Sequence, residues 1–223
     1  MSALSCLRVS AAVASLFLCA CETYPTMEER TQMLAPKAQY FAPPTPGPAP
    51  LVILMSGCGG LVGADGKINP NMDKYAKAAA RSGAYAIIVD SFQPRGMGFD
   101  EAVKTVCTGM QLRGKARSGD ALAGEALAEA HWKTRFTGVI LSGWSHGSWS
   151  IMELLLAGPD AKKLGNLNVG GTKRALSPDA VTLFYPYCGI LNDAGKQPWA
   201  YKGPILLVLA EKDTIGKPDV CTR

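Results

Sequence analysis

One short segment of the sequence has residues and spacing that suit catalysis by a serine, namely Gly143-Trp144-Ser145-His146-Gly147. It has the pattern G-x-S-x-G and stands between an apolar run and a helical pattern. In that context a tight turn strains the serine backbone and lifts the hydroxyl above a sheet, and small flanking residues avoid clashes. The sequence therefore predicts Ser145 as a nucleophile and the backbone N–H of His146 as an oxyanion donor. The alternative is a glycine-rich turn with an inert serine.

A second glycine-rich segment follows the first apolar run after residue 50, and its sequence is Ser56-Gly57-Cys58-Gly59-Gly60-Leu61-Val62-Gly63. In α/β-hydrolases the loop at this position supplies the other oxyanion N–H. We predict that Cys58 carries this donor, with Gly59 as the alternative.

The same loop, with Asp90 at the end of the next apolar run, also imitates a dinucleotide-binding fingerprint. That fingerprint requires glycine where the chain has Val62, and a helix that opens at the loop, whereas the helical pattern begins only near Met72. Both departures argue against a nucleotide-binding fold.

Two acidic residues, Glu211 and Asp213, follow the last apolar run. In the hydrolase order of nucleophile, acid and histidine, Asp213 takes the acid position, and Glu211 is the alternative. No histidine follows Asp213 in the 223 residues. His131 closes a predicted helix roughly 25 Å from Ser145, at about 3.3 Å per strand residue, and the His146 side chain should point away from its neighbour. Neither histidine is therefore predicted to act as the base.

Alternating strands and helices must position these residues. Short continuous apolar runs bounded by turn residues suit strands that are buried on both faces. Helical patterns between them indicate right-handed βαβ units and a mostly parallel sheet, whose strand ends meet at one edge. The predicted strands are 51–55, 84–89, 137–141, 180–185 and 205–209, and the predicted helices are 72–81, 121–130 and 151–157.

Length and composition fit one α/β domain. Apolar residues make up 48% of the chain and charged residues 18%, which excludes a disordered or collagen-like protein. The net charge of +5 comes without a dense basic block, so nucleic acid is not an expected partner. Only two histidines are present, and the closely spaced cysteines lie near the N-terminus, so no zinc site is expected.

The N-terminal segment resembles an export signal. Residues 1–20 have a basic start and an apolar middle, which is typical of a signal peptide. The ending Leu18-Cys19-Ala20-Cys21 resembles a lipobox, so Cys21 is the expected lipid anchor and the protein a periplasmic, membrane-anchored lipoprotein. The alternative is an ordinary signal peptide. Residues 21–50, rich in proline near their end, are expected to form a tether to a hydrolase domain at 51–223.

The loop at 56–60, the segment Asp90-Ser91-Phe92-Gln93-Pro94-Arg95-Gly96 and the elbow at 143–147 together resemble the dienelactone hydrolase family, in particular its exported members. The resemblance covers about residues 50–223. It implies an α/β-hydrolase fold and hydrolysis of small-molecule esters or lactones without a cofactor. Two positions depart from the family: Ser145 replaces the cysteine nucleophile of the founding members, and Ser56 replaces a histidine that orders the first loop.

The resemblance also has implications for Asp213, Arg95 and the base. Asp213 matches the family position of the acid. Arg95 implies a clamp for a substrate carboxylate, and a structural Arg95, bonded to Asp90 or to loop carbonyls, is the alternative. The family places its histidine after one more helix and strand, so a chain incomplete at its C-terminus, inactive as written, is expected. The alternative is a catalytically dead lipoprotein of this fold that binds a ligand or partner.

Four cysteines follow Cys21, namely Cys58, Cys107, Cys188 and Cys221, and they allow three full pairings. Cys188 and Cys221 each lie just after one of two neighbouring predicted strands, at the same sheet edge. In an oxidising compartment we expect the disulfide Cys188–Cys221. Free thiols are the alternative.

Overall fold

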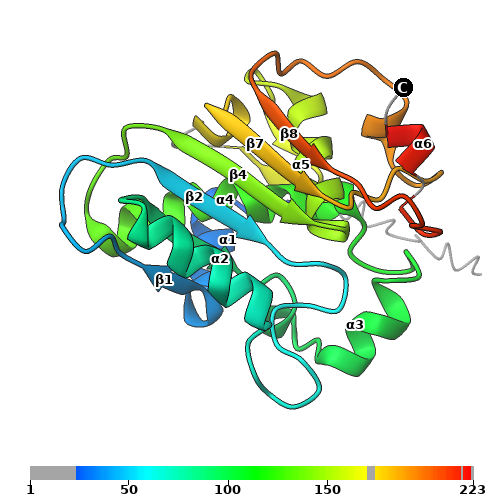
Figure 1. Ribbon diagram of the computed structural model, residues 1–223, viewed down its shortest axis with the longest axis horizontal. Helices are drawn as coiled ribbons and strands as arrows, with labels where there is room; N and C mark the ends of the chain where they lie inside the picture. Colours follow the sequence, from blue (N-terminus) through cyan, green and yellow to red (C-terminus); the bar gives the residue numbers. More distant parts are fainter. Residues whose placement is uncertain (1–23, 170–173, 217, 222–223) are drawn as a thin grey trace, which may run out of the picture.

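The computed structural model describes residues 24–169, 174–216 and 218–221, and its centre is a six-stranded sheet (Figure 1). The strand order is β1-β3-β2-β4-β7-β8, and every neighbouring pair is parallel except β1 with β3. The strands are β1 (Gln39–Phe41), β2 (Leu51–Met55), β3 (Tyr85–Val89), β4 (Val139–Trp144), β7 (Ala180–Phe184) and β8 (Ile205–Val208). This is the mostly parallel α/β sheet that the sequence predicts.

The five parallel strands coincide with the predicted apolar runs. In β3 all five residues are buried, and in β2 four of five are. A strand covered on both faces must be apolar along its whole length, which explains why continuous runs marked these strands in the sequence. At the sheet edge, β8 is less covered, and Leu206 is 59% exposed.

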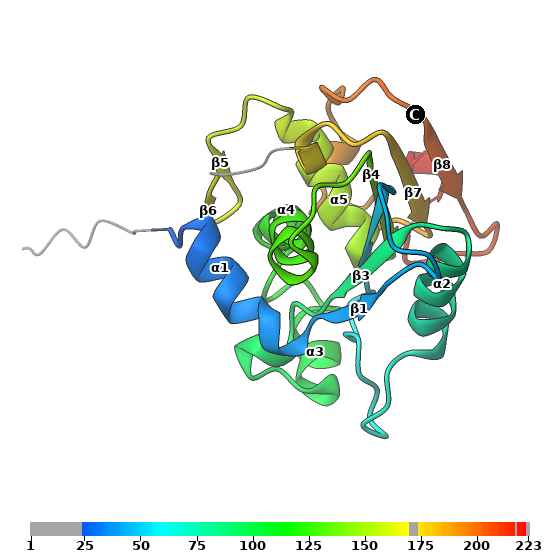
Figure 2. The same cartoon turned by 90° about the vertical axis from the view of Figure 1, so that its left-hand side faces the viewer.

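Helices lie on both faces of the sheet (Figure 2). The helix α2 (Pro70–Arg81) covers β2 and β3 on one face, and α4 (Gly114–Trp132) and α5 (His146–Ala157) pack together on the other. The start of α2 has strong local signals, because the Asn69 side chain accepts hydrogen bonds from the N–H groups of Asn71 and Met72 and Pro70 occupies the first turn.

The N-terminal part of the body is folded, so the predicted tether at 21–50 is wrong for the helix α1 (Met27–Leu34) and for β1. Helix α1 packs on α4, and β1 pairs with β3. The helix has a capping box, in which Thr26 and Glu29 satisfy each other's backbone N–H groups. Its Arg30 is 4% exposed and forms an ion pair with Asp120. This buried contact holds the segment on the body.

The helix α4 begins seven residues before the predicted start at Ala121. Its first half contains Arg117 and Asp120, which are fully buried. Their charges weaken the apolar pattern that marks a core helix, which is why the sequence predicted only the second half.

Smaller elements complete the chain. These are α3 (Phe99–Thr105), α6 (Pro218–Cys221), the hairpin strands β5 (Lys163–Leu164) and β6 (Leu167–Asn168), and the 3-10 turns Ala35–Lys37, Gln93–Arg95, Arg174–Leu176 and Asp193–Gly195. No helix in the described ranges is both long and apolar enough to span a membrane. The predicted signal peptide at 1–20 and the predicted anchor Cys21 lie outside the described residues.

Candidate active site

Ser145 occupies the turn between β4 and α5. Its backbone has φ 51° and ψ −111°, a conformation that L-residues rarely adopt. The turn is fixed on both sides, because the Ser145 N–H donates to the Phe184 carbonyl at 2.8 Å and the Ser145 carbonyl accepts from Trp149 N–H at 3.0 Å. The strained serine at the start of a helix is the geometry that the pentapeptide predicts.

The two glycines of the pentapeptide are required by close backbone approaches. A Cβ on Gly147 would overlap the Met55 carbonyl oxygen and would lie 2.6 Å from that of Ser56. A Cβ on Gly143 would lie 2.6 Å from the Ser148 nitrogen. Both sets of atoms are backbone and cannot turn aside, so glycine at 147 lets α5 approach the end of β2, and glycine at 143 lets β4 approach the first turn of α5.

Four predicted site residues line one cavity of about 340 Å³, namely Ser145, His146, Cys58 and Asp213. They come from the ends of β2, β4 and β8, which the sheet brings to one edge. The rest of the lining is largely apolar or aromatic and consists of Val106, Cys107, Thr108, Gly109, Trp149, Tyr185, Tyr187, Leu191, Ile215 and Gly216. The alternative acid, Glu211, is exposed and is not part of this lining.

Asp213 is held in a local turn after β8. Its Oδ1 accepts hydrogen bonds from the N–H groups of Ile215, at 2.9 Å, and Gly216, at 2.7 Å. The Gly216 carbonyl in turn accepts from the Cys188 N–H at 2.9 Å. Asp213 is thus tied to the loop that follows β7, and the carboxyl group is half-buried at the cavity wall.

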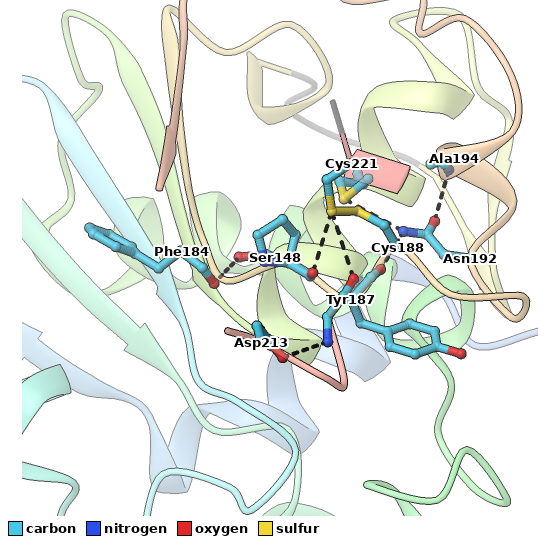
Figure 3. The surroundings of a disulfide bond; sticks show 12 residues. Ser148, Phe184, Tyr187, Cys188, Asn192, Ala194, Asp213 and Cys221 are labelled. Atoms are coloured by element: carbon cyan, nitrogen blue, oxygen red, sulfur yellow. Dashed lines mark hydrogen bonds between the residues drawn. A yellow bond between two sulfur atoms is a disulfide. The ribbon is translucent and has the colours of Figure 1, made fainter. Parts of the chain in front are cut away.

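The predicted disulfide Cys188–Cys221 is present and lies near the Asp213 turn (Figure 3). A second disulfide joins Cys58 to Cys107 and connects the glycine-rich loop to the segment after α3. Cys58 and Cys107 both line the cavity, so this bridge forms part of its wall. One disulfide therefore includes the residue of the proposed oxyanion donor, and the other joins the loop that is hydrogen-bonded to the turn of the proposed acid.

Arg95 does not serve as a substrate clamp, and the prediction that it binds substrate is wrong. Its two terminal nitrogens donate to the two carboxylate oxygens of Asp120, each at 2.9 Å, and Nη1 also donates to the Ser91 carbonyl. Arg95 is not among the residues that line the cavity. The pair with Asp120 uses the two guanidinium N–H groups that would otherwise hold a substrate carboxylate. Arg95 therefore has the structural role given as the alternative in the sequence analysis, with Asp120 as its partner instead of Asp90.

Arg117, which the sequence analysis missed, organises the floor of the site. It is fully buried, and its guanidinium donates to the Ser56 carbonyl at 2.7 Å, the Ser56 hydroxyl at 3.2 Å and the Ser91 hydroxyl at 2.9 Å. It also lies 3.3 Å from His146 Nδ1 and stacks over Phe92. Arg117 thereby connects the ends of β2, β3 and β4 and orders the loop that begins at Ser56.

The buried charges of α4 are mutually compensated. Burial alone would raise the pKa of Asp120, but the neighbouring Arg95 and Arg30 outweigh this and hold the pKa below its usual value. Burial lowers the pKa of Arg117 to about 10 against the favourable charges of Asp120 and Asp90, so Arg117 stays charged at neutral pH. The signal that could have revealed both residues is their spacing of three on a helix of small residues.

The two histidines do not form a base for Ser145. The His146 ring accepts from Arg117 at Nδ1, and its Nε2 is buried. Burial and the Arg117 charge hold the pKa of His146 well below its usual value, so the ring is neutral. His131 lies in the last turn of α4 and stacks on Tyr40 of β1 with ring centroids 3.9 Å apart. In the described part of the chain, no histidine hydrogen-bonds the Ser145 hydroxyl.

Tyr185 and Tyr187 are cavity residues that the sequence analysis also missed. They follow β7 directly, and Tyr185 has a positive φ of 48° and is 43% exposed. Tyr187 packs against Trp149 with ring centroids 5.1 Å apart. Their position after a parallel strand, at the same edge as Ser145, was the available signal.

Solved structures of hydrolases have a fold similar to that of this chain. A dienelactone hydrolase-like promiscuous phosphotriesterase from metagenomic libraries is similar with a TM-score of 0.56 and 17% identity, over 83% of this chain and 67% of that one. A lipase/esterase from Lactobacillus plantarum is similar with a TM-score of 0.55 and 11% identity, over 83% and 77%. The sequence itself matches no protein-family model and no curated protein. The chain has the α/β-hydrolase fold, and its structural neighbours include a dienelactone hydrolase-like phosphotriesterase and a lipase/esterase.

Proposed function

We propose that the protein is a serine hydrolase of carboxylic esters or lactones. The observation that carries the proposal is the strained Ser145, which shares one cavity with Cys58, His146 and Asp213 at the carboxyl edge of a parallel sheet. Hydrolase-type structural neighbours support an esterase-like enzyme at the level of the fold. A small organic ester fits a cavity of this size.

In the proposed reaction the Ser145 oxygen attacks the substrate carbonyl carbon and loses its proton to a base. The negative charge that develops on the carbonyl oxygen is stabilised by the N–H groups of Cys58 and His146 and by the positive end of α5. The intermediate expels the alcohol, which takes up a proton, and water then hydrolyses the acyl group from Ser145. Asp213 has the role of orienting the base and stabilising its charged form.

The described residues supply the nucleophile, donors and acid of this scheme but not the base. Loss of the base removes most of the triad's contribution and leaves a residual effect of about 10³–10⁴-fold over water from binding and oxyanion stabilisation. Exogenous imidazole tests this directly, because Ser145 and Asp213 line the same cavity and imidazole can act between them.

The experiment measures hydrolysis of p-nitrophenyl butyrate by the 223-residue polypeptide at increasing imidazole concentrations, with Ser145→Ala as the blank for imidazole's own reaction. We expect slow Ser145-dependent turnover that imidazole accelerates saturably, and a weaker acceleration in Asp213→Asn. Equal rates for wild type and Ser145→Ala at every imidazole concentration would reject the nucleophile. Ser148→Ala is a neighbouring control, because that hydroxyl bonds the Gly143 carbonyl and is not among the lining residues.

We further propose that Cys21 is lipidated and holds the protein on a periplasmic membrane face. The support is the lipobox-like sequence that ends at Cys21. Only residues 22–26 separate Cys21 from α1, so the anchor would keep the body within roughly 18 Å of the lipid, at about 3.6 Å per residue. Radiolabelled palmitate should enter the wild type but not Cys21→Ser. Release of the unlabelled wild type into the soluble periplasm would contradict this proposal.

A further inference from the structure

The cavity beside Ser145 has an uneven distribution of charge. Among its described lining residues, Asp213 is the one acidic side chain, and no lysine or arginine contributes. The remaining ring in the lining that could carry a positive charge, His146, is held neutral by burial and by the Arg117 charge, which lower its pKa. The cavity thus offers no described cation to an anionic group.

The nearby arginines are engaged elsewhere. Arg95 is paired bidentately with Asp120, and Arg117 is occupied by Ser56, Ser91 and His146 beneath the cavity. A third, Arg113, directs its Nε to the Gly109 carbonyl at 2.8 Å and is not part of the lining. A substrate carboxylate could recruit the first two only by breaking buried ion pairs or the hydrogen bonds that order the first loop.

The walls instead offer apolar contact. Among the lining residues, Tyr185 and Ile215 are 43% and 73% exposed, and Tyr187 packs against the buried Trp149 ring. The Leu191 side chain packs directly against Gly109, since a Cβ on Gly109 would lie 2.5 Å from Leu191 Cδ1. An apolar acyl chain removes these surfaces from water, whereas a carboxylate would lose its own hydration without gaining a partner.

From these contacts we infer that the site selects esters whose acyl group is uncharged and apolar, and discriminates against acyl groups that end in a carboxylate. The inference rests on the proposed hydrolase function and specifies its substrate class. This substrate class differs from the carboxylate-bearing substrate that the sequence analysis expected from Arg95. Leu191 and Thr108 also line the cavity and have no proposed catalytic role, so they are positions where a new charge would change the selectivity.

The test compares two ligands that differ only at the acyl end, phenyl butyrate and phenyl hydrogen succinate. Binding is measured by ligand-observed NMR titration on Ser145→Ala, which cannot turn them over through Ser145. We expect phenyl butyrate to bind at least about tenfold more tightly, because the succinate carboxylate is desolvated in the cavity without a cationic partner. The comparison needs no catalysis, so it stays informative even if the hydrolysis assay fails.

Charge variants sharpen the test. In the same background, Thr108→Lys should tighten succinate binding roughly threefold to fivefold, as a partly exposed ion pair would, and Thr108→Gln should not. Leu191→Lys should act in the same direction, with Leu191→Met as its uncharged control. Thr108 is exposed, so its variants should fold even if Leu191→Lys does not.

Equal or tighter binding of the succinate ester by the Ser145→Ala protein would overturn the inference, and so would the absence of saturable phenyl butyrate binding. An unchanged ligand ratio in a folded Thr108→Lys protein would show that charge at this wall does not set selectivity, and would overturn it as well. If a fluorophosphonate does not label Ser145 but the two esters bind in the expected ratio, the proposed hydrolase function is rejected. The inference that the cavity prefers uncharged ligands then still holds.

Discussion

The two halves of the site are stabilised in different ways. Ser145 stands at the centre of the sheet, where α5 touches β2 through Gly147 and the charges of α4 are paired underneath. Asp213 follows the edge strand β8, where Ile205 and Leu206 are 40% and 59% exposed, and it depends on a short turn and a disulfide. Ser145, the proposed nucleophile, is positioned by close packing around buried charges, whereas Asp213, the proposed acid, is positioned by a local turn and a disulfide. The following predictions test this difference.

The largest effect is expected at the buried charges of the nucleophile half. Asp120→Ala leaves Arg30 and Arg95 without their shared carboxylate, and breaking a buried ion pair in this way costs about 3–5 kcal/mol. Urea unfolding measures the loss. The control is Asp73→Ala, which removes the exposed pair with Lys77 and should cost at most about 0.5 kcal/mol. Similar losses in the two variants would show that the α4 charges do not hold this half together.

The disulfide of the acid half comes next. The double variant Cys188→Ser/Cys221→Ser opens a link across 33 residues and should lower the free energy of unfolding by about 2–4 kcal/mol. Hydrogen exchange should speed up at residues 205–216 and stay slow in β2 and β4, because the acid half has few other contacts. Uniformly faster exchange across the sheet would mean that the two halves are not separately stabilised.

Gly147→Ala tests the close approach of α5 to β2. The new Cβ overlaps backbone oxygens of Met55 and Ser56, so we expect a loss of about 1–3 kcal/mol in unfolding free energy. Gly47→Ala is the matched control, since nothing lies within 4 Å of its Cβ position. A Gly147→Ala protein as stable as this control would contradict the described contact.

A smaller effect is expected from pH through His146. Its folded pKa is lowered, so between pH 6.5 and 5.5 the unfolded chain binds a proton that the folded chain does not, and stability falls as pH falls. For one histidine with an unfolded pKa of 6.5 the loss over this range is about 1 kcal/mol. Urea unfolding at both pH values measures it, and His146→Gln should reduce the difference by that amount. An identical pH dependence in this variant would place the titration elsewhere.

The central sheet and the strained turn at Ser145 could be predicted because each has a local signature: continuous apolar runs for β2 and β3, and two obligatory glycines around Ser145. The roles of Arg30 and Asp120, and Asp120 as the partner of Arg95, could not, because charged residues normally indicate solvent and their burial depends on partners up to 90 residues away. The helix α1 was hidden by the proline-rich stretch after it, although its capping box from Thr26 to Glu29 was visible in the sequence.

Covalent labelling tests the central claim most directly, that Ser145 is the nucleophile of a serine hydrolase. The protein is treated with a fluorophosphonate and digested with trypsin, and the peptide 136–162 is sequenced by mass spectrometry to assign the adduct among Ser142, Ser145, Ser148 and Ser150. We predict an adduct on Ser145 that imidazole accelerates, none in Ser145→Ala, and an unchanged adduct in Ser148→Ala. An adduct on another serine, or equal labelling of wild type and Ser145→Ala, would contradict the account.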